Sequence, residues 1–336
     1  MHGQRKPLLL IVSLFLADFA VLGQASPGAG AQAPLLGSTD GTIVLGGGYF
    51  DQANMATLWK KMIDLTGGAA ISLVIIPTAD SQLEPAIRGG AQTTLIDYEK
   101  AAKDTFARLG VQRLTVLHTR DRRVADSDAF VAPLQSANCV WIPGGDSQLL
   151  FGVYPGTRLQ RELQGVLTRG GVVAGDSAGA MVIGQGLLAV DLDHPAKMPA
   201  APQSGLGLLR DAFIMAHVNR YKAGVVEMGA KTYVSSHPEA TGILIEEHTA
   251  VMIQHGQIIR LIGNGRTGLV DGRGHGSNPV VWLSGSERAE GSVLAGAGDA
   301  HPIRHRRHTA ELVWGGYRDY RDVCHACDEG SVGTRR

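Results

Sequence analysis

The sequence has no excess of charge, few cysteines and only one long hydrophobic run, which lies near its N-terminal end. Basic and acidic side chains number 31 each. This balance argues against a nucleic acid or an anionic membrane surface as the partner, because both attract an excess of positive charge. After residue 33 no segment is long and apolar enough to cross a bilayer. With 44% apolar residues the chain can bury a substantial core, so we expect a globular protein.

The three cysteines and twelve histidines do not indicate a metal site. Cys139 lies in an apolar run, where we expect a small buried side chain. Cys324 and Cys327 form a CxxC pair that can close a local disulfide, whereas a zinc site needs a second such pair. The histidines between residues 301 and 308 are typical of a solvated tail, because a metal site needs positioned supporting groups. We therefore expect no metal and no other cofactor.

The first 33 residues have the pattern of a secretory signal peptide and a linker. Two basic residues precede an apolar run at 7–22, and small residues follow it. Cleavage after Ala25 is favoured over cleavage after Ala33, because Pro34 would stand directly after the second cut. The run is short for a membrane span, which favours export over an uncleaved anchor helix. We expect a secreted or periplasmic protein that has no membrane contact after signal cleavage.

Short apolar runs alternate with longer amphipathic segments from residue 41 onward. Continuous apolar runs separated by helices are typical of parallel strands that are covered on both faces. We therefore expect an α/β fold with a mostly parallel, doubly wound sheet and helices on both faces. The expected strands are residues 42–45, 71–77, 114–118, 139–143, 171–174 and 211–217, and the expected helices are residues 54–65, 97–109, 125–136 and 158–168.

The second half of the chain changes to close-set apolar runs, at residues 242–246, 250–254, 257–262 and 267–270. The two-residue turn His255-Gly256 joins two of these runs, which predicts an antiparallel extension that caps the edge of the sheet. We expect one domain over residues 41–272. Residues 300–336 lack periodicity and are expected to form an irregular tail.

A serine lies between two glycines in the segment Gly175-Asp176-Ser177-Ala178-Gly179, directly after an expected strand. This is the G-x-S-x-G pattern of a nucleophile elbow, in which a cramped turn lifts the hydroxyl clear of the sheet. The N–H groups after the serine then face an incoming carbonyl oxygen. A pattern this short also occurs by chance, so it indicates a nucleophile only where its position in the fold supports that role. Ligand sites of parallel sheets lie at the carboxyl ends of strands, which is where this serine is expected.

A serine becomes a nucleophile when an imidazole accepts its proton and a carboxylate holds that imidazole. His118 and His217 are both expected at strand ends on the side of Ser177, and His217 is preferred because it ends the next strand after the elbow. Asp191 is the preferred carboxylate, since it follows the segment where the elbow helix should end. Such compact spacing argues against a lipase-type esterase, whose acid and base come from much later strands. The other carboxylates in this interval are Asp193 and Asp211.

Four motifs, in order and spacing, resemble the cyanophycinase and aspartyl dipeptidase family of serine peptidases. They are Gly144-Gly145-Asp146 with Gln148, the elbow at 175–180, residues 205–209 leading to His217, and residues 242–247 followed by Thr249-Ala250. The resemblance covers about residues 41–272. It implies a class I glutamine amidotransferase-like fold and the metal-free hydrolysis of a peptide or isopeptide bond next to an aspartyl residue.

The resemblance also implies roles for individual residues and a class of partner. The partner would be a small peptide or isopeptide, and a homodimer is compatible with such a fold. The implied roles are Ser177 as nucleophile, His217 as general base, Asp191 as acidic member, the N–H groups of Gly145 and Ala178 as oxyanion hole, and Gln148 and Arg220 near the substrate.

The chain departs from the family at residues that would choose the substrate. Cyanophycinases carry Asp-Gln before the histidine and several arginines after it, whereas this chain has Met215-Ala216 before it and only Arg220 and Lys222 nearby. Asp176 replaces the usual threonine of the elbow. A pocket without those charged groups would not hold the same zwitterionic substrate. The alternatives are a non-catalytic binding protein of this fold, or an esterase or amidase of broader specificity.

Overall fold

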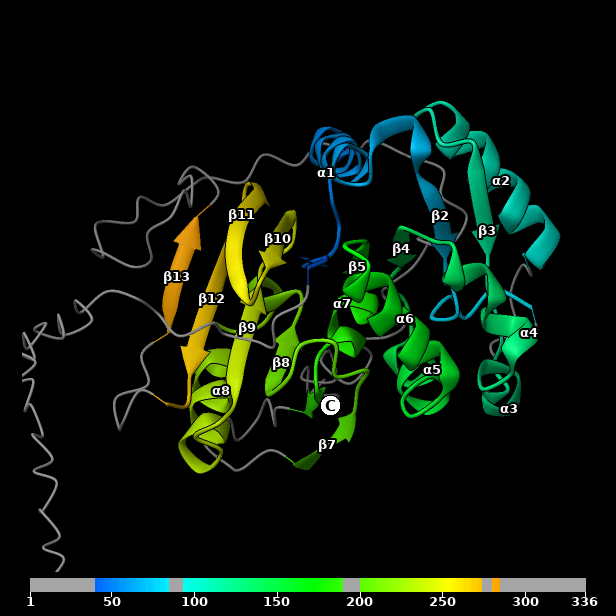
Figure 1. Ribbon diagram of the computed structural model, residues 1–336. Helices are drawn as coiled ribbons and strands as arrows, with labels where there is room; N and C mark the ends of the chain where they lie inside the picture. The colour runs from blue at the N-terminus through cyan, green and yellow to red at the C-terminus, as the bar shows by residue number, and fades with distance from the viewer. Residues whose placement is uncertain (1–39, 85–92, 190–199, 274–279, 285–336) are drawn as a thin grey trace, which may run out of the picture. The chain divides into compact units, whose positions relative to one another are not determined.

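The computed structural model describes residues 40–84, 93–189, 200–273 and 280–284, and these form two β-sheets with surrounding helices (Figure 1). The first sheet has the strand order β11-β10-β1-β5-β4-β2-β3. The five strands β1 to β5 are parallel to one another, and β10 and β11 extend the sheet antiparallel beyond β1. Their bounds are β1 (Thr42–Gly46), β2 (Ser72–Ile75), β3 (Arg113–Val116), β4 (Cys139–Ile142), β5 (Val172–Asp176), β10 (Thr249–Gln254) and β11 (Gln257–Gly263).

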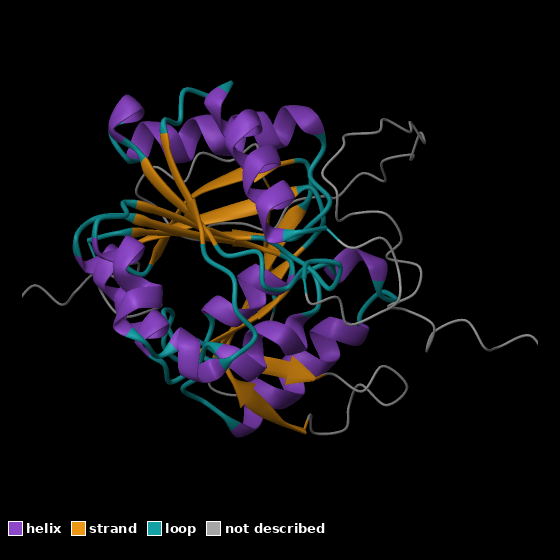
Figure 2. Ribbon diagram, turned by 90° about the vertical axis from the view of Figure 1, so that its right-hand side faces the viewer, coloured by secondary structure: helices purple, strands orange, loops and turns teal. Residues whose placement is uncertain are grey.

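Helices cover both faces of the first sheet, as Figure 2 shows. Neighbouring side chains of a strand point to opposite faces, so Val44 joins one buried cluster while Ile43 and Leu45 join the other. The doubly wound α/β class expected from the sequence is confirmed. The first cluster includes α1 (Gln52–Leu65) and α2 (Leu95–Ala107), and the second includes α5 (Ser147–Val153), α6 (Arg158–Thr168) and α7 (Ala178–Ile183).

The second sheet has the strand order β13-β12-β9-β8-β6-β7. Strand β8 is parallel to β9 and β6, and the other neighbours are antiparallel. Phe213 and Leu244 pack on one face with α8 (Val225–Ser236), while Ile214 and Ile243 join the cluster of α6 and α7. The strand bounds are β6 (Gly186–Ala189), β7 (Ala200–Ser204), β8 (Ala212–Met215), β9 (Thr241–Ile245), β12 (Arg266–Asp271) and β13 (Val281–Ser284).

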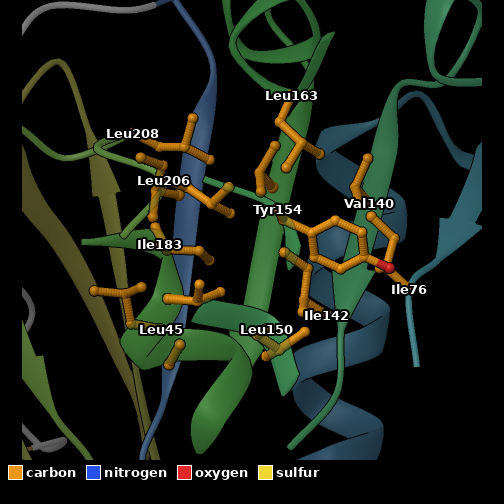
Figure 3. Packing of buried hydrophobic residues seen from close by; sticks show 14 of the residues in the cluster. Leu45, Ile76, Val140, Ile142, Leu150, Tyr154, Leu163, Ile183, Leu206 and Leu208 are labelled. Atoms are coloured by element: carbon orange, nitrogen blue, oxygen red, sulfur yellow. The ribbon is translucent and has the colours of Figure 1, made fainter. Parts of the chain in front are cut away.

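The cluster that includes α6 and α7 is shared by the two sheets. Figure 3 shows Leu45 and Ile142 of the first sheet in this cluster, together with the buried ring of Tyr154. The Tyr154 hydroxyl forms a hydrogen bond with the hydroxyl of buried Thr78, which satisfies the polar end of a mostly apolar side chain. Each large apolar side chain buried in this way stabilises the fold by about 1.5–3 kcal/mol. The cluster therefore holds the strand ends of both sheets in a fixed arrangement.

Helix α7 brings the two sheets together at the serine. It starts directly after β5 and contacts β5 and β1 of the first sheet as well as β8 and β6 of the second. A helix that packs against both sheets places the carboxyl end of β5 near the carboxyl end of β8. Those two strand ends carry Ser177 and His217.

The structure corrects two sequence-based expectations. The expected helix at 125–136 is divided into α3 (Arg122–Ala125), α4 (Asp128–Val131) and the 3-10 helix η2 (Ala132–Gln135). Ser127 caps the start of α4, because its hydroxyl accepts a hydrogen bond from the N–H of Phe130, and Pro133 lies in the first turn of η2. The expected antiparallel extension is divided as well, since β10 and β11 join the first sheet whereas β9 and β12 belong to the second.

Some expectations fall on residues outside the described ranges, namely the signal peptide and linker at 1–33, the tail at 300–336 and the pair Cys324 and Cys327. Across the described part of the chain, no helix combines the length and the hydropathy that a membrane span requires. Cys139, in the middle of the first sheet, is fully buried as expected, and burial raises the pKa of its thiol to about 12.

Candidate active site

Ser177 forms the turn between β5 and α7 in a strained backbone conformation. Its φ of 53° and ψ of −120° lie in a region that L-residues rarely adopt. Hydrogen bonds hold the turn on both sides, since the Ser177 N–H donates to the Gly46 carbonyl and the Ser177 carbonyl accepts from the Met181 N–H, both at 3.0 Å. The residue is 4% exposed. This is the elbow geometry that the G-x-S-x-G pattern predicts.

His217 reaches the serine from the end of β8. Its Nε2 lies 2.7 Å from Ser177 Oγ. The φ of His217 is 57°, which turns the chain out of the strand and into the 3-10 helix η3 (Val218–Arg220). Its ring meets the ring of Tyr49 edge-on, with the two centroids 5.4 Å apart. The imidazole is therefore oriented by both the backbone turn and an aromatic neighbour.

Glu247, which follows β9, contacts the other nitrogen of this imidazole. Its Oε1 lies 2.8 Å from His217 Nδ1, and the two side chains are only 14% and 16% exposed. The Glu247 N–H donates to Asn219 Oδ1 at 2.9 Å, and Arg220 Nε lies 3.6 Å from Glu247 Oε1. Asn219 and Arg220 belong to η3, so the same short helix that follows the histidine also holds the carboxylate.

The contacts of His217 indicate which of its two ring nitrogens carries the proton. An ionised carboxylate only accepts hydrogen bonds, so we assign the imidazole proton to Nδ1, which faces Glu247. The Nε2 of a neutral imidazole is then an acceptor, and it faces the hydroxyl of Ser177. The arrangement allows the hydroxyl to transfer its proton to His217 while Oγ attacks a carbonyl carbon.

A glycine triplet at residues 46–48, which begins with the last residue of β1, joins the parts of the site. Its three successive carbonyl oxygens accept hydrogen bonds at 3.0, 3.1 and 2.8 Å from the N–H groups of Ser177, His217 and His248, in that order. Ser177 and His217 belong to the site themselves, and His248 directly follows Glu247. A single loop of the first sheet therefore positions groups that are far apart in the sequence.

The triplet must be glycine because it passes close to the other parts of the site. A Cβ on Gly48, whose φ is 97°, would lie 2.1 Å from Cε1 of His217. A Cβ on Gly47 would lie 2.0 Å from the carbonyl oxygen of Glu246. A larger residue would displace either the histidine or the turn that carries Glu247.

The structure places Glu247 where the sequence analysis expects Asp191. Asp191 and Asp193 lie outside the described residues, and the carboxylate at His217 Nδ1 belongs to Glu247. Asp211 stands before β8, at the opposite end of the strand from His217. The expectation failed because it considered only carboxylates between the serine and the histidine in the chain.

Three further features were missed as contributors to the site, and two of them left a signal in the sequence. Glu247 follows the expected strand at 242–246, so it could have been placed at the same edge as the other strand ends. The triplet at 46–48 comes directly after the expected strand at 42–45, so its glycines could have been placed at the same edge. Tyr49 comes directly after it, and no pattern in the sequence marks that ring as a neighbour of the histidine.

The residues expected to bind the oxyanion and the substrate lie at the carboxyl ends of β4 and β5. Gly145 follows β4, and Ala178 is the first residue of α7. Gln148 lies in the first turn of α5, where its backbone N–H donates to Asp146 Oδ1 at 2.9 Å. These three residues and Ser177 thus come from neighbouring strand ends, because β4 and β5 are adjacent in the sheet.

Arg220, which is also expected near the substrate, contacts Glu247. Its guanidinium carbon lies 5.2 Å from the centroid of the Tyr49 ring, and its Nε faces Glu247 Oε1. The side chain is about half exposed. This arrangement suits a residue that holds Glu247 in place.

His118, the other histidine considered at a strand end, is engaged elsewhere. Its Nδ1 lies 3.2 Å from Thr78 Oγ1, and its Nε2 lies 2.9 Å from the carbonyl oxygen of Glu84. Burial lowers the pKa of His118, which favours the neutral imidazole. No cluster of histidine, cysteine, aspartate and glutamate side chains in the described ranges could hold a metal ion.

Comparison with known proteins connects this geometry to a family. The profile of peptidase family S51 matches residues 42–261. The cyanophycinase of Nostoc sp. (strain PCC 7120 / SAG 25.82 / UTEX 2576) is 27% identical over 239 residues, which cover 70% of this chain and 74% of the relative. The cyanophycinase of Geminocystis herdmanii (strain PCC 6308) is 26% identical over 235 residues, which cover 69% of this chain and 81% of the relative.

A solved structure shares the fold. The crystal structure of a peptidase from an acI-B1 Actinobacterium superposes with a TM-score of 0.56 and 21% sequence identity, over 75% of this chain and 97% of that chain. The profile match spans more than half of the chain and includes the serine, the histidine and the glutamate described above. The chain belongs to peptidase family S51 and is a serine-type peptidase with the class I glutamine amidotransferase-like fold of that family.

Proposed function

We propose that this protein hydrolyses a peptide or isopeptide bond through an acyl-enzyme on Ser177. The proposal is carried by the continuous set of contacts from Ser177 Oγ to His217 Nε2 at 2.7 Å and from His217 Nδ1 to Glu247 Oε1 at 2.8 Å. A serine without such a partner is a poor nucleophile at neutral pH. The short distances and the low exposure of all three side chains support a preorganised site.

The reaction proceeds in two symmetrical halves. Ser177 Oγ attacks the scissile carbonyl carbon while its proton passes to His217 Nε2, and the charge of the imidazolium is balanced by Glu247. The C–N bond then breaks, the proton on Nε2 passes to the departing amine, and the acyl group stays on Oγ. Water attacks the ester by the same proton path, which releases the acid and restores the serine hydroxyl.

The developing oxyanion would face the N–H groups of Gly145 and Ala178. Ala178 follows the nucleophile, and its N–H is the first of α7, where a helix leaves its N–H groups without an intrahelical acceptor. Gly145 comes from the adjacent strand end, with a φ of 144° that turns its peptide unit in the loop. Donors from two neighbouring strand ends can converge on one oxygen atom.

We propose a substrate other than cyanophycin, although two relatives are named cyanophycinase. Met215 and Ala216, which precede the histidine, are buried and apolar. Arg220 is directed to Glu247 and Tyr49. The two positions before the histidine therefore lack the polar groups that cyanophycinases carry there, and a short peptide or isopeptide fits this site better.

We also propose that the protein is exported. The support is the basic, apolar and small-residue pattern of residues 1–33, which lie outside the described ranges. Mass spectrometry of the protein from fractionated cells should find a mature N-terminus at Ser26 in the periplasm or the medium. An intact N-terminus found only in the cytoplasmic fraction would contradict export.

Replacement of the nucleophile tests the proposed reaction. In Ser177→Ala, hydrolysis of a panel of aspartyl and β-aspartyl dipeptides should fall by about 1,000-fold or more, because no acyl-enzyme can form. Circular dichroism and thermal unfolding serve as the control that the variant is folded. Hydrolysis that persists in the folded variant would rule out Ser177 as the nucleophile.

A further inference from the structure

Three polar side chains that take no part in the proposed reaction are hydrogen-bonded to one another around the loop that follows β2. Thr78 belongs to this loop, and its hydroxyl bonds to the hydroxyl of Tyr154. On its other side, Thr78 Oγ1 lies 3.2 Å from His118 Nδ1. Thr78 and Tyr154 are fully buried. We call these three residues the Thr78 cluster.

The direction of the hydrogen bonds in the Thr78 cluster follows from the outer contact of the imidazole. His118 Nε2 lies 2.9 Å from the carbonyl oxygen of Glu84, which can only accept, so Nε2 carries the ring proton. Nδ1 of the neutral ring is then an acceptor, and Thr78 donates to it. The Thr78 oxygen accepts the hydroxyl proton of Tyr154 in turn. The buried Thr78 hydroxyl thus both donates and accepts, which holds it in one position.

The residue after Thr78 packs directly against the loop of the expected oxyanion hole. Ala79 is fully buried, and its carbonyl oxygen accepts the Asp146 N–H at 2.8 Å. The same oxygen lies so close to Gly145 that a Cβ on this glycine would approach it to 2.2 Å. The peptide unit between Gly145 and Asp146 is therefore fixed against Ala79. Any displacement of Ala79 also displaces the N–H of Gly145.

Helix α5 is attached to the loop after β2 at both of its ends. Asp146 caps the start of the helix and is bonded to the Ala79 carbonyl. Tyr154 follows the last residue of the helix and is bonded to Thr78. Each attachment meets one of two consecutive residues of the loop. The side-chain contact of Tyr154 therefore reinforces the backbone contact that holds the Gly145 loop.

On the proposed function, in which the Gly145 N–H faces the oxyanion, we infer that the residues of the Thr78 cluster are positioning residues for the oxyanion hole. An oxyanion donor is effective because it is already held where the charge develops, so that it need not reorganise during the reaction. The Thr78 cluster holds the backbone of Ala79, and Ala79 holds Gly145. The cluster thus acts on the reaction without touching the substrate.

Removal of single hydroxyl groups tests this inference. Tyr154→Phe and Thr78→Val each lose one hydroxyl and keep most of the side-chain volume. For the aspartyl or β-aspartyl dipeptide that the wild type hydrolyses fastest, kcat and kcat/KM should fall equally, by about 10-fold, because the oxyanion donor acts in the transition state. Thr78→Ser keeps the hydroxyl and should keep most of the activity. Unchanged kcat in both Tyr154→Phe and Thr78→Val would overturn the inference.

The double variant Tyr154→Phe/Thr78→Val shows whether the two hydroxyls act through their shared hydrogen bond. Either single substitution already breaks that bond, so the double variant should have about the kcat of the less active single variant. If the two losses of kcat multiply instead, the hydroxyls act separately, and that result would contradict the inference.

Thr66→Val is the matched control, because it also removes a buried hydroxyl that forms a hydrogen bond. Thr66 Oγ1 donates to the Met62 carbonyl at 3.0 Å. The residue lies at the opposite edge of the sheet, where its own carbonyl accepts from the side chain of Asn138, just before β4, at 3.1 Å. Thr66→Val should lower the melting temperature and leave kcat unchanged. If its kcat falls as far as that of Thr78→Val, a general loss of stability accounts for the result and the inference is wrong.

Failure of the proposed function has a different signature, because the position of the Gly145 loop can be measured without a substrate. If the wild type hydrolyses no dipeptide, hydrogen exchange of the Asp146 amide, followed by NMR, decides the inference separately. Exchange should be faster in Tyr154→Phe and Thr78→Val than in the wild type and Thr66→Val, because the bond to Ala79 then opens more often. Exchange at the wild-type rate in both variants would overturn the inference.

Discussion

Three side chains separated by 30 or 40 positions in the sequence act together because one backbone loop positions them. The carbonyl oxygens of residues 46–48 hold the backbones of the serine, the histidine and the turn after the glutamate. The reacting atoms are therefore placed by the fold, before any substrate binds.

Glu247→Gln tests the role of the carboxylate. The amide keeps the shape of the side chain but cannot balance an imidazolium, so peptide hydrolysis should fall by about 100-fold or more. Glu246→Gln is the control, since Glu246 pairs with Arg266 at 2.7 Å and faces away from the imidazole. It should retain full activity, while the loss of charge on this largely buried carboxylate, which also accepts the Arg266 N–H, should cost about 1–3 kcal/mol of unfolding free energy. Equal activities of the two variants would contradict the assignment.

Gly48→Ala tests the close approach of the loop to the histidine. The new Cβ would meet Cε1 of His217, so activity should be lost along with stability. Gly67→Ala is matched in backbone strain, with a φ of 87°, but its Cβ would have no neighbour closer than 3.8 Å. It should cost about 1 kcal/mol or more of unfolding free energy and leave hydrolysis unchanged. Full activity in Gly48→Ala would show that the imidazole does not depend on this contact.

At the scale of residues, the sequence pattern was informative where the chemistry is local. The two glycines around Ser177 mark a cramped turn, and His217 directly follows an apolar run. The acid partner is not local, because Glu247 becomes a neighbour of the histidine only when β8 and β9 pair in parallel. The register of that pairing is a property of the whole second sheet, and no short motif encodes it.

Among the elements, the junction of β5 and α7 carries strain that serves the reaction. Ser177 is held with positive φ at the point where a strand becomes a helix, while α7 packs between the two sheets. The contacts of α7 with both sheets offset the cost of the strained turn, so Ser177 keeps its positive φ.

Comparison of Ser177→Gly with Ser177→Ala measures this strain. Both variants lose the nucleophile, but glycine adopts a φ of 53° without the penalty that alanine meets. We expect Ser177→Gly to have the higher unfolding free energy, by about 1 kcal/mol, in denaturant titrations. In a helix of ordinary backbone geometry the alanine variant has the higher unfolding free energy, so the expected order is reversed here. A more stable alanine variant would show that the turn is not strained.

At this same scale, strands with strong apolar runs were predicted more reliably than the segments between them. The expected helix at 125–136 has helical spacing, yet the hydroxyl of Ser127 and the ring of Pro133 interrupt it. The hydrogen bond of the Ser127 hydroxyl starts a new helix inside a segment whose apolar spacing predicts one continuous helix. The strand at residues 211–217 was found, but its place in a second sheet depends on partners that follow it in the chain.

For the whole molecule, the cluster shared by the two sheets makes the site and the core interdependent. The cluster contains residues of β1 and β5 from the first sheet and of β8 and β9 from the second. Loss of packing in either sheet should therefore separate Ser177 from His217. The fold class could be predicted because alternating strands and helices constrain it strongly, whereas the division into two sheets could not.

Cys139 reports on the unfolding of this core. Alkylation requires the thiolate, and burial raises the pKa of the thiol to about 12, so the folded protein should resist iodoacetamide at pH 8.5. In a denaturant series, alkylation of the Cys139 peptide should rise together with the loss of hydrolytic activity. Peptide mass spectrometry distinguishes it from Cys324 and Cys327. Modification of Cys139 while activity is intact would contradict a core that unfolds as one unit.

The central claim is that Ser177 is a nucleophile activated by His217, and covalent labelling measures this most directly. A fluorophosphonate probe should form one adduct with the folded wild-type protein, and peptide mass spectrometry should locate it on Ser177. In His217→Ala the rate of labelling should fall by at least about 100-fold, because no base then accepts the hydroxyl proton. An adduct on another residue, or an unchanged rate in His217→Ala, would contradict the account.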